Sequence, residues 1–265
     1  DGYMILDKII ETKKEEVERL NKETSRSELL EKISGLKPCR NFRHSLKNSG
    51  CNIIAELKCA SPSRGRLAAK FDHLNIARTY EKNGAAAISI LTDEKYFMGH
   101  KDYLTQISQV VKRPLLRKDF IIDPLQVYET RAIGADAILL IVRVLGKKLE
   151  EFIALAQAIG LYSLVEVHTR EELEMALDAG ADIIGINNRD LDTFAVDIKT
   201  SCRLQAGIPE DKISVSESGI RERKDIEFLM QSGIHAFLIG EHLVTAADIG
   251  KKLRDLRGED GNDPD

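Results

Sequence analysis

The 265-residue sequence contains no tryptophan, and only 5% of its residues are aromatic. Its few cysteines show no CxxC spacing of the kind that zinc sites use. No apolar run approaches the roughly 18 residues that a membrane-spanning helix needs, and the N-terminal residues have a charged helical pattern without the apolar core of a signal peptide. These absences predict a cytoplasmic protein that has no membrane partner and keeps its cysteines reduced, at Cys39, Cys51, Cys59 and Cys202.

An excess of basic charge is also missing. The net charge is −4, the isoelectric point is near 6.0, and the basic residues are spread along the chain. A nucleic-acid-binding protein usually shows a basic stripe, so nucleic acid is not expected among the partners. The histidines share no metal-ligand spacing, and no metal site is expected from His44, His73, His100, His168, His235 and His242.

Short apolar runs alternate with amphipathic segments from residue 51 onward. Near-continuous apolar character over four to seven residues is what parallel strands need when both faces of the sheet are covered. The segments between these runs carry an apolar residue every three or four positions, which indicates helices. The pattern predicts eight strands, over 52–58, 85–91, 114–120, 136–142, 162–167, 182–187, 212–217 and 235–240.

A repeated glycine separates four of these helices from the strands that follow. Gly84, Gly134, Gly180 and Gly233 recur about every 50 residues, the length of two strand–helix units. Each predicts a helix that ends in the left-handed conformation, followed by a turn of small residues. An open doubly wound sheet could use the same device, but eight units without an opening GxGxxG favour closure. We therefore predict an α/β fold, a (β/α)8 TIM barrel, over residues 51–257.

The two ends of the chain differ from this pattern. Residues 1–50 are predicted to form a helical extension that packs on the barrel. Its first helix places apolar residues at helical spacing, and a second helix is predicted over Ser27–Ile33 with Ser27 as the N-cap. The acidic, glycine-containing tail, 258–265, is predicted to be disordered.

Polar residues crowd the ends of five predicted strands. Glu56 and Lys58 stand two positions apart, so their side chains leave the same face of the first strand. Taken singly, such a pair is more simply an ion pair in a barrel layer. Recurrence on five of eight strands favours a convergent site, because catalytic residues of such barrels lie at the carboxyl ends of the strands. The other four groups are Arg117–Phe120, Glu166–His168, Asn187–Asp190 and Ser216–Gly219.

Glycines after the last two strands indicate an anion site. Ser218-Gly219-Ile220 and Ile239-Gly240-Glu241 allow backbone N–H groups to approach a phosphate, which such barrels usually bind at this position. Ser61 and Arg64 lie in the first loop, from which they can reach the same group. The pattern predicts a phosphorylated small-molecule substrate and leaves its identity open.

Six motifs in this order resemble the indole-3-glycerol phosphate synthase family, from about Ile5 to Leu256: IIAELKCASPSRG, LLRKDFIID, LVEVHT, IGINNRDL, SVSESGI and FLIGEHL. The resemblance implies closure of an indole ring on 1-(o-carboxyphenylamino)-1-deoxyribulose 5-phosphate, with loss of carbon dioxide and water. It implies a carboxy-lyase of tryptophan biosynthesis that uses no cofactor. Association with other enzymes of that pathway is a further expectation.

The resemblance also implies roles for single residues. Lys118 matches the general acid that activates the substrate carbonyl, and Glu166 matches the carboxylate that assists proton transfer. Lys58 matches the lysine that holds the substrate carboxylate. The division of steps between the two lysines stays open. The polar shell of the site is matched by Glu56, Asn187, Glu217 and Ser218.

Substrate-binding positions follow from the same resemblance. Phe97, Phe120, Leu140 and Leu191 are expected to line the anthranilate slot, with Arg189 near the site. The phosphate is expected at Ser61, Gly219, Gly240 and the backbone of Glu241. The chain departs from the family pattern at Cys59 and Ala60, where longer or basic residues are frequent, and at Glu241, where some members have serine. A backbone contact survives the last change, whereas a hydroxyl contact does not.

Three alternatives remain open at this point. Phosphoribosylanthranilate isomerase and thiamine phosphate synthase are other phosphate-binding barrels, although the isomerase would be expected to use a cysteine and an aspartate at strand ends. A catalytically inactive barrel that serves as a binding partner would have lost a catalytic position, and none is lost here.

Overall fold

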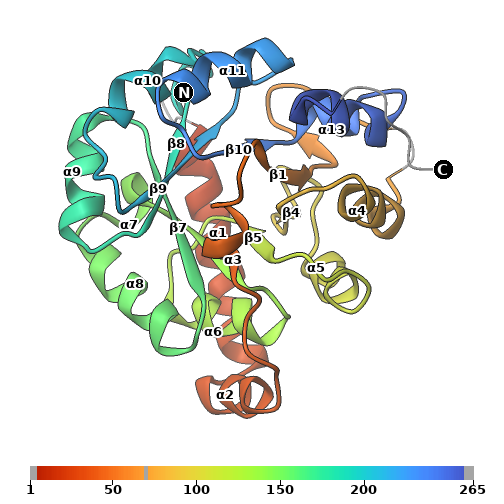
Figure 1. The fold of residues 1–265 in the computed structure, drawn as a ribbon. Coiled ribbons are helices and arrows are strands. Elements are labelled where there is room, and N and C mark those ends of the chain that lie inside the picture. Colours follow the sequence, from red (N-terminus) through yellow and green to blue (C-terminus); the bar gives the residue numbers. More distant parts are fainter. Residues whose placement is uncertain (1–4, 69–70, 260–265) are drawn as a thin grey trace.

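The computed structural model describes residues 5–68 and 71–259. In this part of the chain eight parallel strands close a barrel in the order β1-β10-β9-β8-β7-β6-β5-β4, which confirms the predicted TIM-barrel fold (Figure 1). Six of the predicted strands begin one or two residues too early. The strands are β1 Asn52–Leu57, β4 Ala87–Leu91, β5 Leu115–Lys118, β6 Ala137–Ile141, β7 Tyr162–Val167, β8 Ile183–Asn187, β9 Ile213–Glu217 and β10 Ala236–Ile239.

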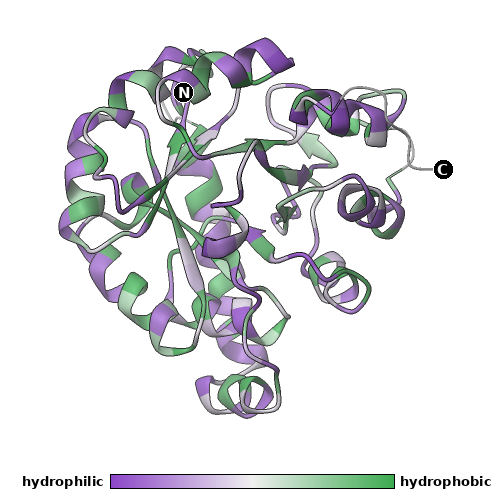
Figure 2. Cartoon of the chain, viewed as in Figure 1, coloured by the Kyte–Doolittle hydropathy of each residue, from purple (hydrophilic) through white to green (hydrophobic). Residues whose placement is uncertain are grey.

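Helices surround the strands in Figure 1, and Figure 2 shows apolar strands inside helices of mixed hydropathy. The four repeated glycines have φ values between 81° and 97°, as the left-handed helix ends require. The outer helices are α4 His73–Lys82, α5 Lys101–Ser108, α6 Pro124–Ala132, α8 Leu149–Ala158, α9 Arg170–Asp178, α10 Lys199–Gln205, α11 Arg223–Gln231 and α13 Ile249–Arg257. Shorter elements lie in the loops: β2 Ala60–Ser61, β3 Gly65–Arg66, α7 Val142–Leu145, the 3-10 helix Gly146–Lys148 and α12 Glu241–Val244.

Alternate strand residues form two separate cores. Ala137, Leu139 and Ile141 of β6 belong to the core inside the barrel, whereas Ile138 and Leu140 pack outward among the helices. This alternation is the two-residue period of a strand. It means that a side chain reaches the inside of the barrel only if its position has the correct parity.

The N-terminal extension contributes three helices: α1 Ile5–Glu23, α2 Arg26–Ser34 and α3 Phe42–Ser45. Phe42 belongs to the inner core, so α3 packs against the interior of the barrel. The predicted N-cap of the second helix is wrong. The cap is Ser25, whose hydroxyl accepts the backbone N–H of Glu28 while the Glu28 carboxylate accepts the N–H of Ser25.

The predicted disordered tail, 258–265, lies outside the described residues except for Gly258 and Glu259. Gly258 ends α13 in the left-handed conformation, with φ of 78°. None of the helices within residues 5–68 and 71–259 combines the length and the apolar character that crossing a membrane requires.

Candidate active site

The polar residues at the carboxyl ends of the strands converge on one pocket. Glu56 and Lys118 line it from β1 and β5, and Glu166 lines it from β7. A second, continuous pocket shares Glu56 and Lys118 and adds Glu217 from β9. Side chains far apart in the sequence meet here because every parallel strand ends at the same rim of the barrel.

Three carboxylates surround the ammonium group of Lys118. Its Nζ lies 3.7 Å from Glu217 Oε2, and 3.9 Å from an oxygen of both Glu56 and Glu166. Burial disfavours the ammonium form, but the charges of Glu56, Glu217 and Glu166 outweigh burial and raise the pKa of Lys118. Since the side chain is 18% exposed, this lysine is a protonated acid that faces the pocket.

Two glycines leave room for these carboxylates because they have no side chain: Gly185 in β8 and Gly240 directly after β10. A methyl group added at Gly185 of β8 would overlap Glu217 Oε1, and one added at Gly240 would overlap Glu56 Oε1. The two glycines therefore allow two carboxylates to lie beside Lys118.

Glu56 is also paired with the second lysine of the site. Lys58 Nζ lies 3.0 Å from Glu56 Oε1, and Lys58 is partly exposed to the pocket. Burial would raise the pKa of Glu56, but the charges of Lys58 and Lys118 lower it. Glu56 is accordingly a buried carboxylate held between two cations.

A network of hydrogen bonds fixes one oxygen of Glu166. Asn187 Nδ2 donates to Glu166 Oε1 at 3.2 Å, and the hydroxyl of Ser218 donates to Asn187 Oδ1 at 2.9 Å. The backbone N–H of Arg189 donates to the same Asn187 oxygen at 3.0 Å. Burial opposes ionisation of Glu166, but the hydrogen bond from His168 and the charge of Lys118 lower its pKa. Glu166 is thus a carboxylate that can accept a proton.

Glu217 has a different environment although it is equally buried. Neither of its carboxyl oxygens has a hydrogen-bond partner among the described residues. Burial and the nearby charge of Glu166 raise its pKa, against the charge of Lys118. A raised pKa beside a lowered one gives the site both a proton donor and a proton acceptor.

Three of the four predicted phosphate-binding positions line one pocket with Arg64, and Ser61 lines the adjoining one. Ser218 and Gly219 have positive φ values of 68° and 82°, so the chain turns directly after β9. Gly219, Gly240 and Glu241 line the same pocket as Arg64. Arg64 Nε lies 3.1 Å from Glu241 Oε1, so this carboxylate is already paired with a cation.

Three of the four residues expected on the apolar side line the pocket, and one does not. Phe97, Phe120 and Leu191 line the pocket, and the rings of the two phenylalanines lie 6.2 Å apart. Leu140 does not line it, because its side chain packs outward among the helices. Leu139 and Ile141, on the other face of the same strand, line the pocket instead.

Helix α1 forms one wall of the pocket, a position that was not predicted from the sequence. Ile5, Leu6 and Ile9 line the pocket from this helix. Their apolar spacing predicted a buried face, but a pattern does not say what that face covers. Of the remaining candidates, Ser61, Arg189 and Ser218 also line the pocket, as do Asn187 and Glu241.

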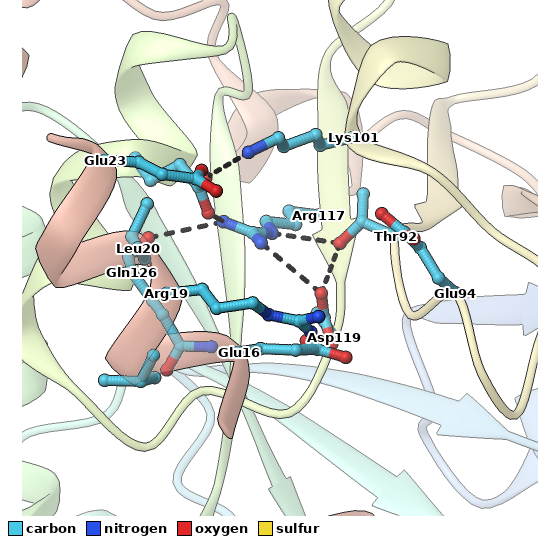
Figure 3. Close-up of a pocket in the computed structure, with 12 residues that line it drawn as sticks. Glu16, Arg19, Leu20, Glu23, Thr92, Glu94, Lys101, Arg117, Asp119 and Gln126 are labelled. Atoms are coloured by element: carbon cyan, nitrogen blue, oxygen red, sulfur yellow. Dashed lines mark hydrogen bonds and ion pairs between the residues drawn. The ribbon is translucent and has the colours of Figure 1, made fainter. Parts of the chain in front are cut away.

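A second cavity opens beside the catalytic pocket, beneath α1 (Figure 3). Its volume is about 240 Å³. Two of its cations are paired: Arg117 donates to Glu129 at 2.9 Å and to Thr92 at 3.0 Å, and Lys101 donates to Glu129 at 3.1 Å. The contacts with Glu129 join β5 and the start of α5 to α6.

Comparisons with known proteins agree with this geometry. The family model described as "Indole-3-glycerol phosphate synthase" matches residues 6–256. A protein of that name from Desulforamulus reducens is 48% identical over 256 residues, which cover 96% of this chain and 97% of that one. Another of the same name, from Alkaliphilus metalliredigens, is 48% identical over 256 residues, covering 96% and 98%.

A solved structure supports the fold alone. Thiamine phosphate pyrophosphorylase from Pyrococcus furiosus superposes with a TM-score of 0.62 at 17% identity, covering 82% of this chain and 96% of that one. At this identity the likeness carries no information about the substrate.

Proposed function

Because the chain belongs to the indole-3-glycerol phosphate synthase family, we propose that it converts 1-(o-carboxyphenylamino)-1-deoxyribulose 5-phosphate to indole-3-glycerol phosphate. The reaction closes a ring and releases carbon dioxide and water, so the enzyme is a carboxy-lyase of tryptophan biosynthesis. The observation that carries the proposal is the Lys118 ammonium among three carboxylates, at the meeting point of an apolar slot and an anion site.

Lys118 acts as the general acid for ring closure. Attack of an aromatic carbon on the substrate ketone needs a proton on the carbonyl oxygen, and a partly buried ammonium supplies one. The three carboxylates hold this lysine protonated and restrict where its Nζ lies. Their negative charges also stabilise the ammonium group of Lys118 before the substrate binds.

Glu166 accepts the proton that the methylene carbon beside the amine nitrogen loses when water is eliminated after decarboxylation. Its Oε1 is held by Asn187, while Oε2 faces Lys118 at 3.9 Å. The oxygen that faces the lysine is therefore the one that can exchange protons with substrate. Dehydration then needs an acid and a base close together, and this pair provides both.

Lys58 binds the substrate carboxylate before it leaves as carbon dioxide. The apolar slot of Phe97, Phe120 and Leu191 holds the aromatic ring, and Arg189 lies at its edge. Packing on the ring together with a cation at the carboxylate fixes the geometry for decarboxylation. The phosphate lies at Gly219, Gly240 and the backbone of Glu241, with Ser61 on the side of the first loop.

Indole fluorescence tests the proposal directly. The chain contains no tryptophan, so the emission of the product is measured against little protein background. Purified protein given the carboxyphenylamino sugar phosphate should develop this emission without added metal. Lys118→Ala should lose more than about 100-fold in kcat, the usual scale of general acid catalysis, while it still binds substrate through the phosphate contacts.

Lys112→Ala is the matched control, since Lys112 is exposed and precedes the opposite end of the same strand. It should keep the parent kcat. The proposal fails if the unmutated protein is silent with this substrate and active on a different sugar phosphate.

We also propose that the enzyme works in the cytoplasm, alongside other enzymes of the pathway. The four cysteines are unpaired in the structure, as a reducing compartment requires. Gel filtration of this protein mixed with the enzymes that precede and follow it would detect association as an earlier elution of both partners.

A further inference from the structure

Strands β1 and β7 end in the same arrangement of charges. In β1 the carboxylate of Glu56 is followed two positions later by Lys58, whose Nζ lies 3.0 Å away. In β7 the carboxylate of Glu166 is followed two positions later by His168, whose Nε2 lies 3.3 Å from Glu166 Oε1. Residues two apart on a strand share a face, so each carboxylate has a basic neighbour beside it. The two basic residues differ in one respect, because Lys58 lines the pocket and His168 does not.

The other side of the His168 ring faces a second carboxylate. His168 Nδ1 lies 3.1 Å from Glu172 Oε2, and the backbone N–H of His168 donates to the same oxygen at 2.6 Å. Glu172 belongs to the first turn of α9, where its own N–H donates to the N-cap hydroxyl of Thr169 at 3.2 Å. The start of α9 therefore fixes the carboxylate, and the carboxylate fixes the ring.

Both ring nitrogens lie beside carboxylate oxygens: Nδ1 is 3.1 Å from Glu172 Oε2, and Nε2 forms an ion-pair contact of 3.3 Å with Glu166 Oε1. A neutral imidazole has one N–H, so its other nitrogen would place a lone pair against a carboxylate. The imidazolium form carries positive charge toward both carboxylates. The electrostatic environment favours the same form: burial lowers the pKa of His168, but the adjacent carboxylates of Glu166 and Glu172 raise it to about 10.

We propose that His168 is a positioning residue for the reaction: held as a cation by Glu172, it anchors Glu166 Oε1 and keeps Glu166 ionised, so that Oε2 is free for proton transfer. The inference rests on the proposed role of Glu166. It assigns a task to a side chain that does not touch the substrate pocket. It also explains why Glu166 stays ionised while Glu217, which has no such partner, does not.

All charged groups around Glu166 enter the expected pH dependence. Lys118 from β5 and His168 favour the carboxylate form of Glu166, whereas Glu56 from β1 and Glu217 from β9 disfavour it. Removing the charge of His168 leaves Lys118 as the remaining nearby cation. The carboxyl group should then take up a proton at a higher pH.

The test compares variants of the full chain that separate charge from hydrogen bonding. His168→Gln keeps a donor toward Glu166 but carries no charge, and His168→Ala removes both. We expect the acid limb of the kcat profile to rise by about one pH unit in His168→Gln, equivalent to a tenfold change in the ratio of ionised to protonated Glu166. The KM should change less than threefold, because the substrate contacts remain.

Glu172→Gln should move the acid limb in the same direction by less, since it only weakens the hold on the imidazolium. His235→Gln is the matched control, because His235 is a partly buried histidine at the opposite end of the barrel, with its Nδ1 near Ser214. Its kcat profile should coincide with that of the parent.

Two results would overturn the inference. One is a kcat profile of His168→Gln and His168→Ala that coincides with the parent while only the melting temperature falls. The other is nitrogen-15 NMR of labelled histidine showing a ring with a single proton at pH 8. If instead the parent makes no indole product, the proposed function fails, and the NMR experiment still tests the state of His168.

Discussion

Removing the buried ammonium of Lys13 should destabilise the protein more than any other single change to a charge in α1. Lys13 Nζ lies 2.7 Å from Asp93 Oδ2, 2.8 Å from Asp119 Oδ1 and 2.8 Å from Glu16 Oε2. Lys13 is fully buried, as is Asp93, and Asp119 is nearly so. Asp93 follows β4 and Asp119 follows β5, so this lysine joins the N-terminal extension to the rim of the barrel.

The magnitude follows from what Lys13→Met leaves behind. Methionine fills most of the space, but Asp93 stays buried without a cation, and Asp119 keeps only its ion pair with Arg117 at 3.4 Å. Breaking a buried ion pair by removing one partner costs about 3–5 kcal/mol. For a chain of this size each kcal/mol lowers the melting temperature by about 2–4 °C, so the expected decrease is about 6–20 °C.

Circular dichroism at 222 nm during heating measures this decrease without need of tryptophan. Lys14→Met is the matched control, because Lys14 is exposed and its ion pair, with Glu11 at 2.6 Å, lies on the surface. It should cost less than about 0.5 kcal/mol. Lys13→Met with Asp93→Asn removes one of the stranded charges and should recover part of the loss. A decrease of under about 1 kcal/mol in Lys13→Met would refute the reasoning.

Two further predictions concern Glu217. Gly185→Ala should lower kcat at least tenfold, because the added methyl overlaps Glu217 Oε1. Combining it with Glu217→Asp should restore part of the activity, because aspartate is shorter. A kinetic assay of the single and the double variant checks this. Glu217→Gln should be inactive yet more stable than the parent at alkaline pH. Burial and the charge of Glu166 raise the pKa of Glu217 in the folded state. Protonated Glu217 therefore stabilises the folded protein fully below the unfolded pKa, and this stabilisation is lost as the pH rises through the folded pKa. Urea unfolding from pH 4 to 9 should show this fall in the parent, and an equal fall in the Gln variant would contradict it.

The barrel could be predicted from the sequence because its signals are local. A buried parallel strand is a short apolar run, and the helix that precedes four of the strands ends in a glycine with positive φ. Local capping chemistry also identifies Ser25, and not Ser27, as the N-cap of α2. Glu28 stands three residues after Ser25 and completes a capping box, whereas the residue three after Ser27 is Leu30.

The position of Leu140 was predictable in principle from parity. Ile141 pairs in register with Glu166, and Leu140 pairs with Val165. Since Glu166 faces the pocket, Ile141 faces it too and Leu140 does not. The strand register therefore predicts the face on which Leu140 lies, and the family resemblance alone did not take that register into account.

The contacts of Lys13 could not be predicted in this way. Its partners Asp93 and Asp119 are about 80 and 106 residues away in the sequence, and no local pattern relates them. A lysine on an amphipathic helix is usually solvated. Only the docking of α1 on the rim of the barrel turns it into a buried ion pair.

The charges around Lys118 explain why one acid of the site should hold a proton. Four carboxylates face three cations there: Glu56, Glu166, Glu172 and Glu217 against Lys58, Lys118 and His168. Buried charge is costly unless it is balanced, and this favours a proton on the carboxyl group that has the fewest partners. The proton belongs on Glu217, because its two oxygens lack hydrogen bonds whereas Glu166 and Glu172 accept them. We expect protonated Glu217 to present a donor to the ribulose hydroxyls beside the ammonium of Lys118. This arrangement makes the His168 and Glu217 variants complementary: removing the cation should push a proton onto Glu166, and Glu217→Gln should mimic the protonated state without being able to release it.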